Sequence, residues 1–283
     1  MNPVRIIVDS TADFSPALKE RVDCVPLTIH FGSEDYIDGV TIDHQAFYEK
    51  LTASAVLPTT SQATPFAFAE AYEKAVERGE DVVVITISSL LSGTYQSAVI
   101  AAEDFPGRVH VVDSRSVALG SGILAEYALT LADQGLSAAA IAEALTRERE
   151  KVHLVALLDT LEFLKRGGRI SSAVAFAGGM LSIKPIICLD GGEISILTKA
   201  RGAKQGGAML TQQAQALGAM DPERPFLLGY TGVSDEQMQA YLQEHAAALF
   251  GGKSVPTSVV GSVVGTHAGP GAIALAFFEK AAE

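Results

Sequence analysis

The first half of the chain alternates short apolar runs with amphipathic stretches. VRIIVD, DVVVITI and RVHVVDS are almost continuously apolar, as is typical of strands buried on both faces of a parallel sheet. Helical periodicity follows them, over residues 65–78, from near Thr94, over 117–134 and over 137–150. Strands and helices in this alternation indicate βαβ units, so we predict an α/β, Rossmann-like N-terminal domain with a parallel sheet.

Between the first two of these strands the pattern is less regular. It predicts a short helix over residues 15–22, a single strand CVPLTIHF and turns in FGSEDYIDG. A helix is expected over residues 43–51, with Asp43 as its N-cap.

The second half has a different pattern. VHLVALL, PFLLGYT and PTSVVGSVV are expected strands, LEFLKRGG and SSAVAFAGGM are expected helices, and a last helix is expected after Gly271. In IKPIICLDGGEISILTKA, Asp190-Gly191-Gly192 lies between two β-branched runs, which is a strong hairpin signal. We therefore predict an α+β C-terminal domain with a mixed or antiparallel sheet, and domains of residues 1–150 and 151–283.

Composition removes several classes of function. The 283 residues carry 21 Lys and Arg against 33 Asp and Glu, a net charge of -12, which disfavours nucleic acid and offers nothing to an anionic membrane. No run approaches the roughly 20 apolar residues of a membrane span, so we expect a cytoplasmic protein without stable membrane insertion. Scattered histidines and two distant cysteines predict no metal site and no cofactor.

Three polar segments, each expected in a loop after an apolar run, could carry chemistry. In SSLLSGTYQS, Ser92 and Gly93 precede a predicted helix, where hydroxyls and exposed N–H groups can bind an anion, although Ser92 could equally be a simple N-cap. PTTSQATP, which contains Thr60, is a second hydroxyl cluster. In GTHAGPG, glycines frame His267, which could bind an anion, act as a base or be structural.

Two short segments concentrate positive charge in this acidic chain. KRGGRIS contains Arg169 and KARGAK contains Arg201. They predict a site for an anion or an acidic partner. The alternatives are a solvated basic face, or, for Arg169, an internal pair with a carboxylate.

The ordered set of motifs resembles the DegV family. The matching segments are IVDSTAD, PTTSQATP, SSLLSGTYQSA, VVDSRSVALGSG, LEFLKRGGRIS, the Lys-Pro of IKPII, the Lys-x-Arg of TKARG, and GTHAGPG. The resemblance implies two α/β domains with one long-chain fatty acid between them. It also implies a non-catalytic subunit that presents the carboxylate to a fatty acid kinase, whose acyl phosphate feeds phospholipid synthesis. The family's carboxylate-binding positions fall on Thr60, Ser92 and His267, and we add the N–H near Gly93.

Two other functions remain open on the residues alone. An acyl hydrolase or transferase could use His267 to activate Ser92. A binder of sugar or nucleotide phosphates could use the glycine loops.

We expect a monomer, and we expect Arg169 and Arg201 to face the kinase or its phosphate chemistry.

Overall fold

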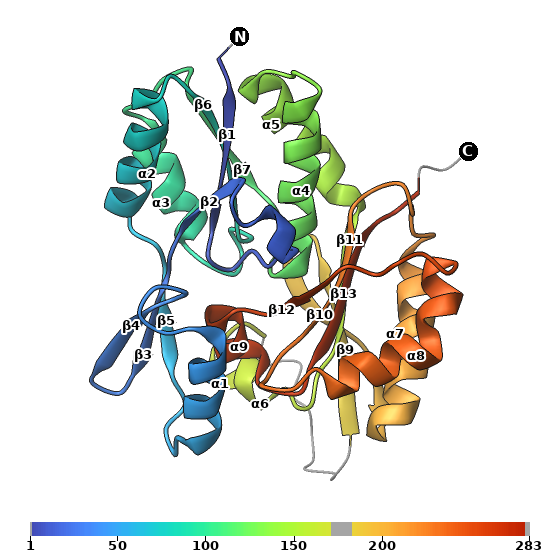
Figure 1. Ribbon diagram of the computed structural model, residues 1–283. Coiled ribbons are helices and arrows are strands. Elements are labelled where there is room, and N and C mark those ends of the chain that lie inside the picture. Colours follow the sequence, from blue (N-terminus) through green and yellow to red (C-terminus); the bar gives the residue numbers. More distant parts are fainter. Residues whose placement is uncertain (1, 171–182, 281–283) are drawn as a thin grey trace.

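A four-stranded parallel sheet forms the first part of the fold (Figure 1). The computed structural model describes residues 2–170 and 183–280. The strand order is β2-β1-β6-β7, with β1 at Val4–Asp9, β2 at Val22–Val25, β6 at Asp81–Thr86 and β7 at Val109–Asp113. Its helices are α2 (Pro65–Glu77), α3 (Thr94–Ala102), α4 (Leu119–Asp133) and α5 (Ala138–Glu148).

Alternation along these strands explains why both faces of the sheet are covered. Ile6 and Val83 belong to the core that includes α4 and α5, whereas Ile7 and Val82 belong to the core that includes α2 and α3. Successive side chains of a strand point to opposite faces, so a continuously apolar strand needs helices on both sides. The predicted parallel α/β sheet is confirmed.

A six-stranded mixed sheet forms the second part, in the order β10-β9-β8-β13-β11-β12. Only β11 and β12 pair in parallel, and the remaining pairs are antiparallel. The strands are β8 (Val152–Leu157), β9 (Ile183–Asp190), β10 (Glu193–Arg201), β11 (Phe226–Tyr230), β12 (Thr257–Val259) and β13 (Ile273–Phe278). Helices α7 (Gly202–Leu217) and α8 (Glu236–Phe250) lie on one face, and α4 packs toward the other (Figure 1). The predicted mixed sheet is confirmed.

A smaller three-stranded sheet, β4-β3-β5, lies below the parallel sheet in Figure 1. It consists of β3 (Thr28–Phe31), β4 (Glu34–Ile37) and β5 (Thr59–Ser61). Helices α1 (His44–Ala53), α6 (Glu162–Arg166) and α9 (Ser262–Ala268) gather beside it. Short 3₁₀ turns occur at Pro16–Leu18 and Arg149–Lys151.

Three expectations for the first half were wrong, wholly or in part. Residues 15–22 form only the turn at Pro16–Leu18, because Val22 already pairs with Ile6 in the parallel sheet. CVPLTIHF is not one strand but parts of β2 and β3, which belong to different sheets. Pro26 lies at the break, where its missing N–H could not have joined a ladder. The supposed turn segment FGSEDYIDG contains β4.

The C-terminal region also departs from the prediction. PTSVVGSVV is a strand only over Thr257–Val259, and α9 begins at Ser262. The expected last helix is instead strand β13, which lies between β8 and β11. Its alanines favour a helix locally, but burial of every residue in a central strand overrides that preference. The predicted helix SSAVAFAGGM lies outside the described residues.

Local turn and cap signals were more reliable. Asp43 accepts a hydrogen bond from the N–H of Ala46 at 2.8 Å and caps α1 as predicted. The β9–β10 hairpin turns where expected, with φ of 58° at Gly191 and 97° at Gly192. Both values lie in the left-handed region that glycine adopts readily.

Candidate functional site

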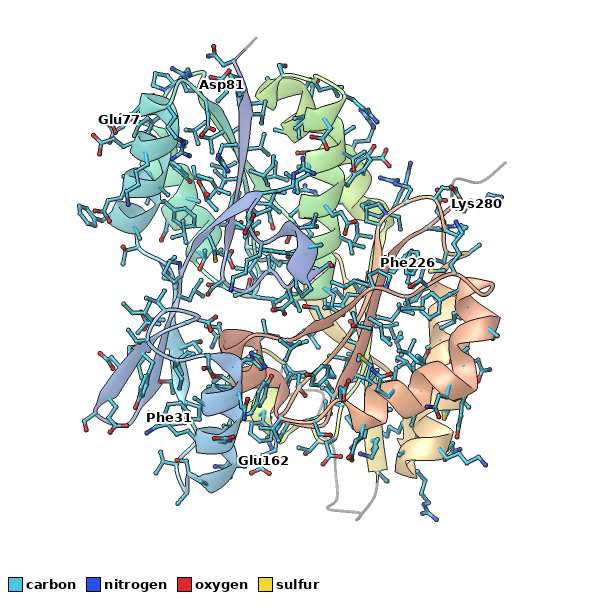
Figure 2. All side chains as sticks on the ribbon, viewed as in Figure 1. Phe31, Glu77, Asp81, Glu162, Phe226 and Lys280 are labelled. Carbon is cyan, nitrogen blue, oxygen red and sulfur yellow. The ribbon has the colours of Figure 1, made fainter. Side chains whose placement is uncertain are left out.

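An apolar cavity lies where the parallel sheet, the six-stranded sheet and α9 meet. Figure 2 shows Asp81, at the start of β6, at the far end of the parallel sheet, so the strand's carboxyl end points toward this junction. The cavity's empty volume is about 940 Å³, including its open mouth. Most lining residues are aliphatic: Leu27, Ile87, Leu91, Val117, Ala118, Leu154, Ala156, Leu158, Leu164, Ile187, Leu189, Ile194, Val260, Val263, Val264, Ala268, Ala272 and Ala274. The polar ones are Thr11, Thr60, Gln62, Ser92, Arg169, Thr231 and His267.

Thr60 and His267 meet at this cavity although 207 positions separate them in the sequence. The Thr60 hydroxyl and His267 Nε2 lie 2.9 Å apart. Neither residue lies in a loop as expected: Thr60 is in strand β5 and His267 is in helix α9. Regular backbone therefore fixes the two side chains more firmly than loops would.

His267 is a neutral imidazole at pH 7. Burial, and then the positive charge of Arg169, lowers its pKa to about 4. Its Nδ1 is buried without a hydrogen-bond partner among the described residues. Gly167 makes room for it, since a Cβ at that position would overlap Nδ1. A neutral ring has one N–H donor and one acceptor nitrogen, so it can bind a carboxyl oxygen without forming an ion pair.

Ser92 lines the same cavity from the turn before α3. Its hydroxyl lies 2.9 Å from the Thr94 hydroxyl and accepts a hydrogen bond from the Thr94 N–H at 3.2 Å. Ser92 is not the N-cap of α3 that the alternative proposed, because the N-cap is Gly93 and no side chain caps the helix there. The Ser92 hydroxyl bonds to Thr94, the first residue of the helix, and Ser92 also lines the cavity. Gly93 is not among the lining residues.

Gln62 is a lining residue that the sequence analysis missed. Its side-chain amide donates to Ser97 Oγ at 2.9 Å, and a Cβ at Gly93 would overlap it. Gln62 therefore joins β5, which carries Thr60, to α3, which follows Ser92. Its place directly after Thr60-Ser61 in PTTSQATP was the available signal.

The two arginines singled out in the sequence differ in position. Arg169 lines the cavity, and its guanidinium donates to the carbonyls of Gly167 at 2.6 Å and Leu91 at 3.3 Å. These are backbone contacts, not the carboxylate pair that was the alternative. Arg201 ends strand β10, is exposed, and is not among the lining residues.

The geometry does not form a Ser92–His267 nucleophile pair. His267 Nε2 lies against Thr60, and Ser92 bonds to Thr94. A Ser–His–Asp sequence of contacts occurs elsewhere, with His30 at 2.7 Å from Ser61 and at 2.6 Å from Asp35. These three residues belong to the three-stranded sheet, and their contacts are exposed to solvent. None of the three lines the cavity.

Asp9 forms hydrogen bonds to two of the loops that border the cavity. It is fully buried and accepts hydrogen bonds from the N–H groups of Thr11 at 2.9 Å and Ile87 at 2.7 Å. Burial raises the pKa of Asp9 even though these bonds act in the opposite direction. Because Thr11 and Ile87 both line the cavity, Asp9 helps fix its wall.

Residues 2–170 and 183–280 contain no group of three or more His, Cys, Asp or Glu side chains that could hold a metal ion. Within the same ranges no helix is long and apolar enough to cross a membrane.

The fold and the cavity define a class: an α/β protein with a parallel and a mixed sheet and an apolar cavity that carries a few hydroxyl, imidazole and guanidinium groups. A family model described as an uncharacterised protein of the DegV family matches residues 3–280. The chain belongs to the DegV family.

Solved structures and curated relatives agree with this assignment. A DegV domain-containing protein of Caldanaerobacter subterraneus is 34% identical over 286 residues, covering 99% of this chain and 100% of the relative. A DegV family protein from Thermus thermophilus, whose structure is described as showing fatty acid binding, has a TM-score of 0.88 and 33% identity, covering 99% of this chain and 100% of that one. The Streptococcus pneumoniae fatty acid kinase B3 protein, loaded with linoleic acid, has a TM-score of 0.85 and 25% identity, with coverage of 99% and 100%.

Proposed function

We propose that this protein binds one long-chain fatty acid between its domains of residues 1–150 and 151–283, with the alkyl chain in the apolar cavity. The carboxylate would lie at Thr60, Ser92 and His267, near the N–H of Gly93. The observation that carries this proposal is the Thr60–His267 contact at the wall of an otherwise aliphatic cavity. The fatty acids bound by the Thermus and Streptococcus relatives support it.

The energetics suit such a ligand. Burying a chain of about 16 carbons at about 0.8 kcal/mol per methylene is worth on the order of 12 kcal/mol before the costs of ordering. A carboxylate carried into an apolar cavity costs several kcal/mol unless it is hydrogen-bonded. The hydroxyls of Thr60 and Ser92 and the neutral ring of His267 can supply those bonds.

We further propose that the protein is a non-catalytic subunit that presents the carboxylate to a fatty acid kinase, so that the acyl phosphate enters phospholipid synthesis. The fatty acid kinase B3 relative supports this assignment. Arg169 lines the cavity and could stabilise the charge that builds on the transferred phosphoryl group. Arg201 is exposed and would contact the kinase. The subunit would act as a cytoplasmic monomer.

Organic extraction of the purified protein followed by mass spectrometry tests fatty acid binding. We expect about one fatty acid per chain, or stoichiometric uptake of added oleate or palmitate by delipidated protein. Protein that contains no lipid and binds neither ligand would contradict the proposal.

A further inference from the structure

Helix α9 belongs to the C-terminal half of the chain but is held by side chains of the N-terminal half. Immediately before it, the Tyr48 hydroxyl donates to the Val260 carbonyl at 3.1 Å. The N–H of Gly261 donates to Asp13 Oδ1 at 2.9 Å. The N–H groups of Ser262 and Val263 donate to Asp38. The start of the helix that carries His267 is therefore fixed by two carboxyl groups from other parts of the fold.

These two carboxyl groups are buried, where the charged form of a carboxyl group is destabilised. Asp13 is 8% exposed and Asp38 is 6% exposed. Burial, reinforced by the neighbouring acidic groups, raises the pKa of Asp13 well above its usual value, and burial also raises that of Asp38. Asp13 Oδ2 has no hydrogen-bond partner among the described residues. A raised pKa means that the folded state binds protons more tightly than the unfolded state, so these groups lower stability as pH rises.

We propose that Asp13 and Asp38 are positioning residues of the fatty-acid site, which set the place of α9 so that His267 meets Thr60. This inference rests on the function proposed above. His267 lies five positions after Ser262, about 7.5 Å along the helix axis. Because a helix moves as a unit, a shift at its anchored end is carried to the imidazole. Displacements of about 1 Å are enough to disrupt a hydrogen-bonded site.

The bland alternative is ordinary helix capping, which stabilises α9 without any consequence for ligand binding. If Asp13 positions His267, losing the acceptor at position 13 should weaken ligand binding. If Asp13 only caps the helix, losing it should lower stability alone. Asp13→Asn keeps an oxygen that can accept from Gly261, whereas Asp13→Leu keeps the branched shape, with larger methyl groups, and has no acceptor. Ser137→Ala is the matched control, because Ser137 caps α5 by accepting from Ala140 at 3.3 Å and does not line the cavity.

The experiment measures fatty acid affinity by displacement of a fluorescent fatty acid, together with the ¹⁵N chemical shifts of the His267 ring in ligand-free protein. We expect Asp13→Leu to weaken affinity at least tenfold and to move the ring signals. Asp13→Asn should stay within about threefold of the wild type, and Ser137→Ala should lower stability without changing affinity.

If Asp13→Leu does not fold, Asp38→Asn replaces it. Asp13 accepts through Oδ1 alone, whereas Asp38 accepts from the N–H groups of both Ser262 and Val263, so the loss of one acceptor oxygen at position 38 should lower affinity severalfold. Unchanged affinity and unchanged His267 signals in a folded Asp13→Leu or Asp38→Asn variant would overturn the inference. So would equal losses in Asp13→Leu and Asp13→Asn. Failure of the wild type to bind fatty acid would instead overturn the proposed function, while the ring signals of the ligand-free variants would still test the positioning.

Discussion

At the scale of single residues, the proposed carboxylate site consists of uncharged hydroxyl and imidazole groups, with one charged group, Arg169, lining the same cavity. The Thr60 hydroxyl lies 2.9 Å from the His267 ring, and Ser92 faces the same cavity. The low pKa of His267 keeps its ring neutral at pH 7. Such a site can hold a carboxylate by hydrogen bonds and leave it reactive, whereas a tight ion pair would lower its reactivity.

Removing one hydroxyl should therefore weaken fatty acid binding without abolishing it. We expect Thr60→Val and Ser92→Ala each to cost roughly 1–3 kcal/mol of binding free energy, the usual cost of losing one partner of a buried polar group. Calorimetry with oleate on delipidated protein measures this cost. Ser61→Ala is the control, because alternation along β5 turns the Ser61 side chain away from Thr60. Equal losses in all three variants would contradict the assignment.

The buried imidazole of His267 also predicts a pH dependence. Its pKa falls from an unfolded value near 6.5 to about 4, so the unfolded state binds more protons between these values. The contribution of His267 to the free energy of unfolding is therefore complete above about pH 6.5 and is lost as pH falls toward 4.

Urea unfolding of wild type and His267→Gln from pH 4 to pH 8 tests this dependence. The wild type should lose more stability than the variant between pH 6.5 and pH 4. An NMR titration that places the pKa of the ring near 6.5 would show the prediction to be wrong.

At the scale of elements, the β9–β10 hairpin closes one wall of the cavity. Leu189 and Ile194, on either side of its turn, both line the cavity. The turn is attached to the parallel sheet's loops by one buried hydrogen bond, from Ser88 Oγ to the Gly192 carbonyl at 2.7 Å. A Cβ at Gly192 would lie 2.7 Å from that hydroxyl, so the close approach depends on glycine.

Ser88→Ala should loosen this hairpin. Losing a buried hydrogen bond at a cost of roughly 1–3 kcal/mol should raise amide exchange in residues 186–194 by about 5- to 150-fold, as hydrogen–deuterium exchange would measure. Ser89→Ala is the matched control, because the Ser89 hydroxyl bonds to Asp113 instead. Similar exchange in the hairpin for both variants would show that the Ser88 contact does not hold it.

At the scale of the whole molecule, the proposed partnership with a fatty acid kinase requires a surface of this protein that the kinase can contact. The chain has a net charge of -12, yet Arg201 lies exposed in a basic segment at the end of β10. Because phosphoryl transfer to a carboxylate builds negative charge, arginines near that chemistry or at the partner's surface would favour it.

Charge reversal separates this role from ligand binding. We expect Arg201→Glu to bind fatty acid normally and to lose most kinase-dependent phosphorylation. Arg147→Glu makes the same charge change on α5, where the Arg147 side chain is 71% exposed, and should leave both activities intact. Survival of phosphorylation in Arg201→Glu would mean that the segment is only a solvated surface.

The sequence by itself determined the features that depend on local physics. Continuous apolar runs specified the parallel strands, Asp43 specified a helix start, and Asp190-Gly191-Gly192 specified a hairpin. The resemblance of the ordered motifs to the DegV family also pointed to Thr60, Ser92 and His267. The structure places these three residues on the wall of one cavity.

Only the tertiary structure decided which segments pair over long distances. IALAFF has alanines that favour a helix, but a central position between β8 and β11 makes it a strand. GSVV was expected in a strand and GTHA in a loop, but Asp13 and Asp38, more than 200 positions away, hold the start of a helix there. Local propensities differ by less than about 1 kcal/mol per residue, so burial and distant hydrogen bonds override them.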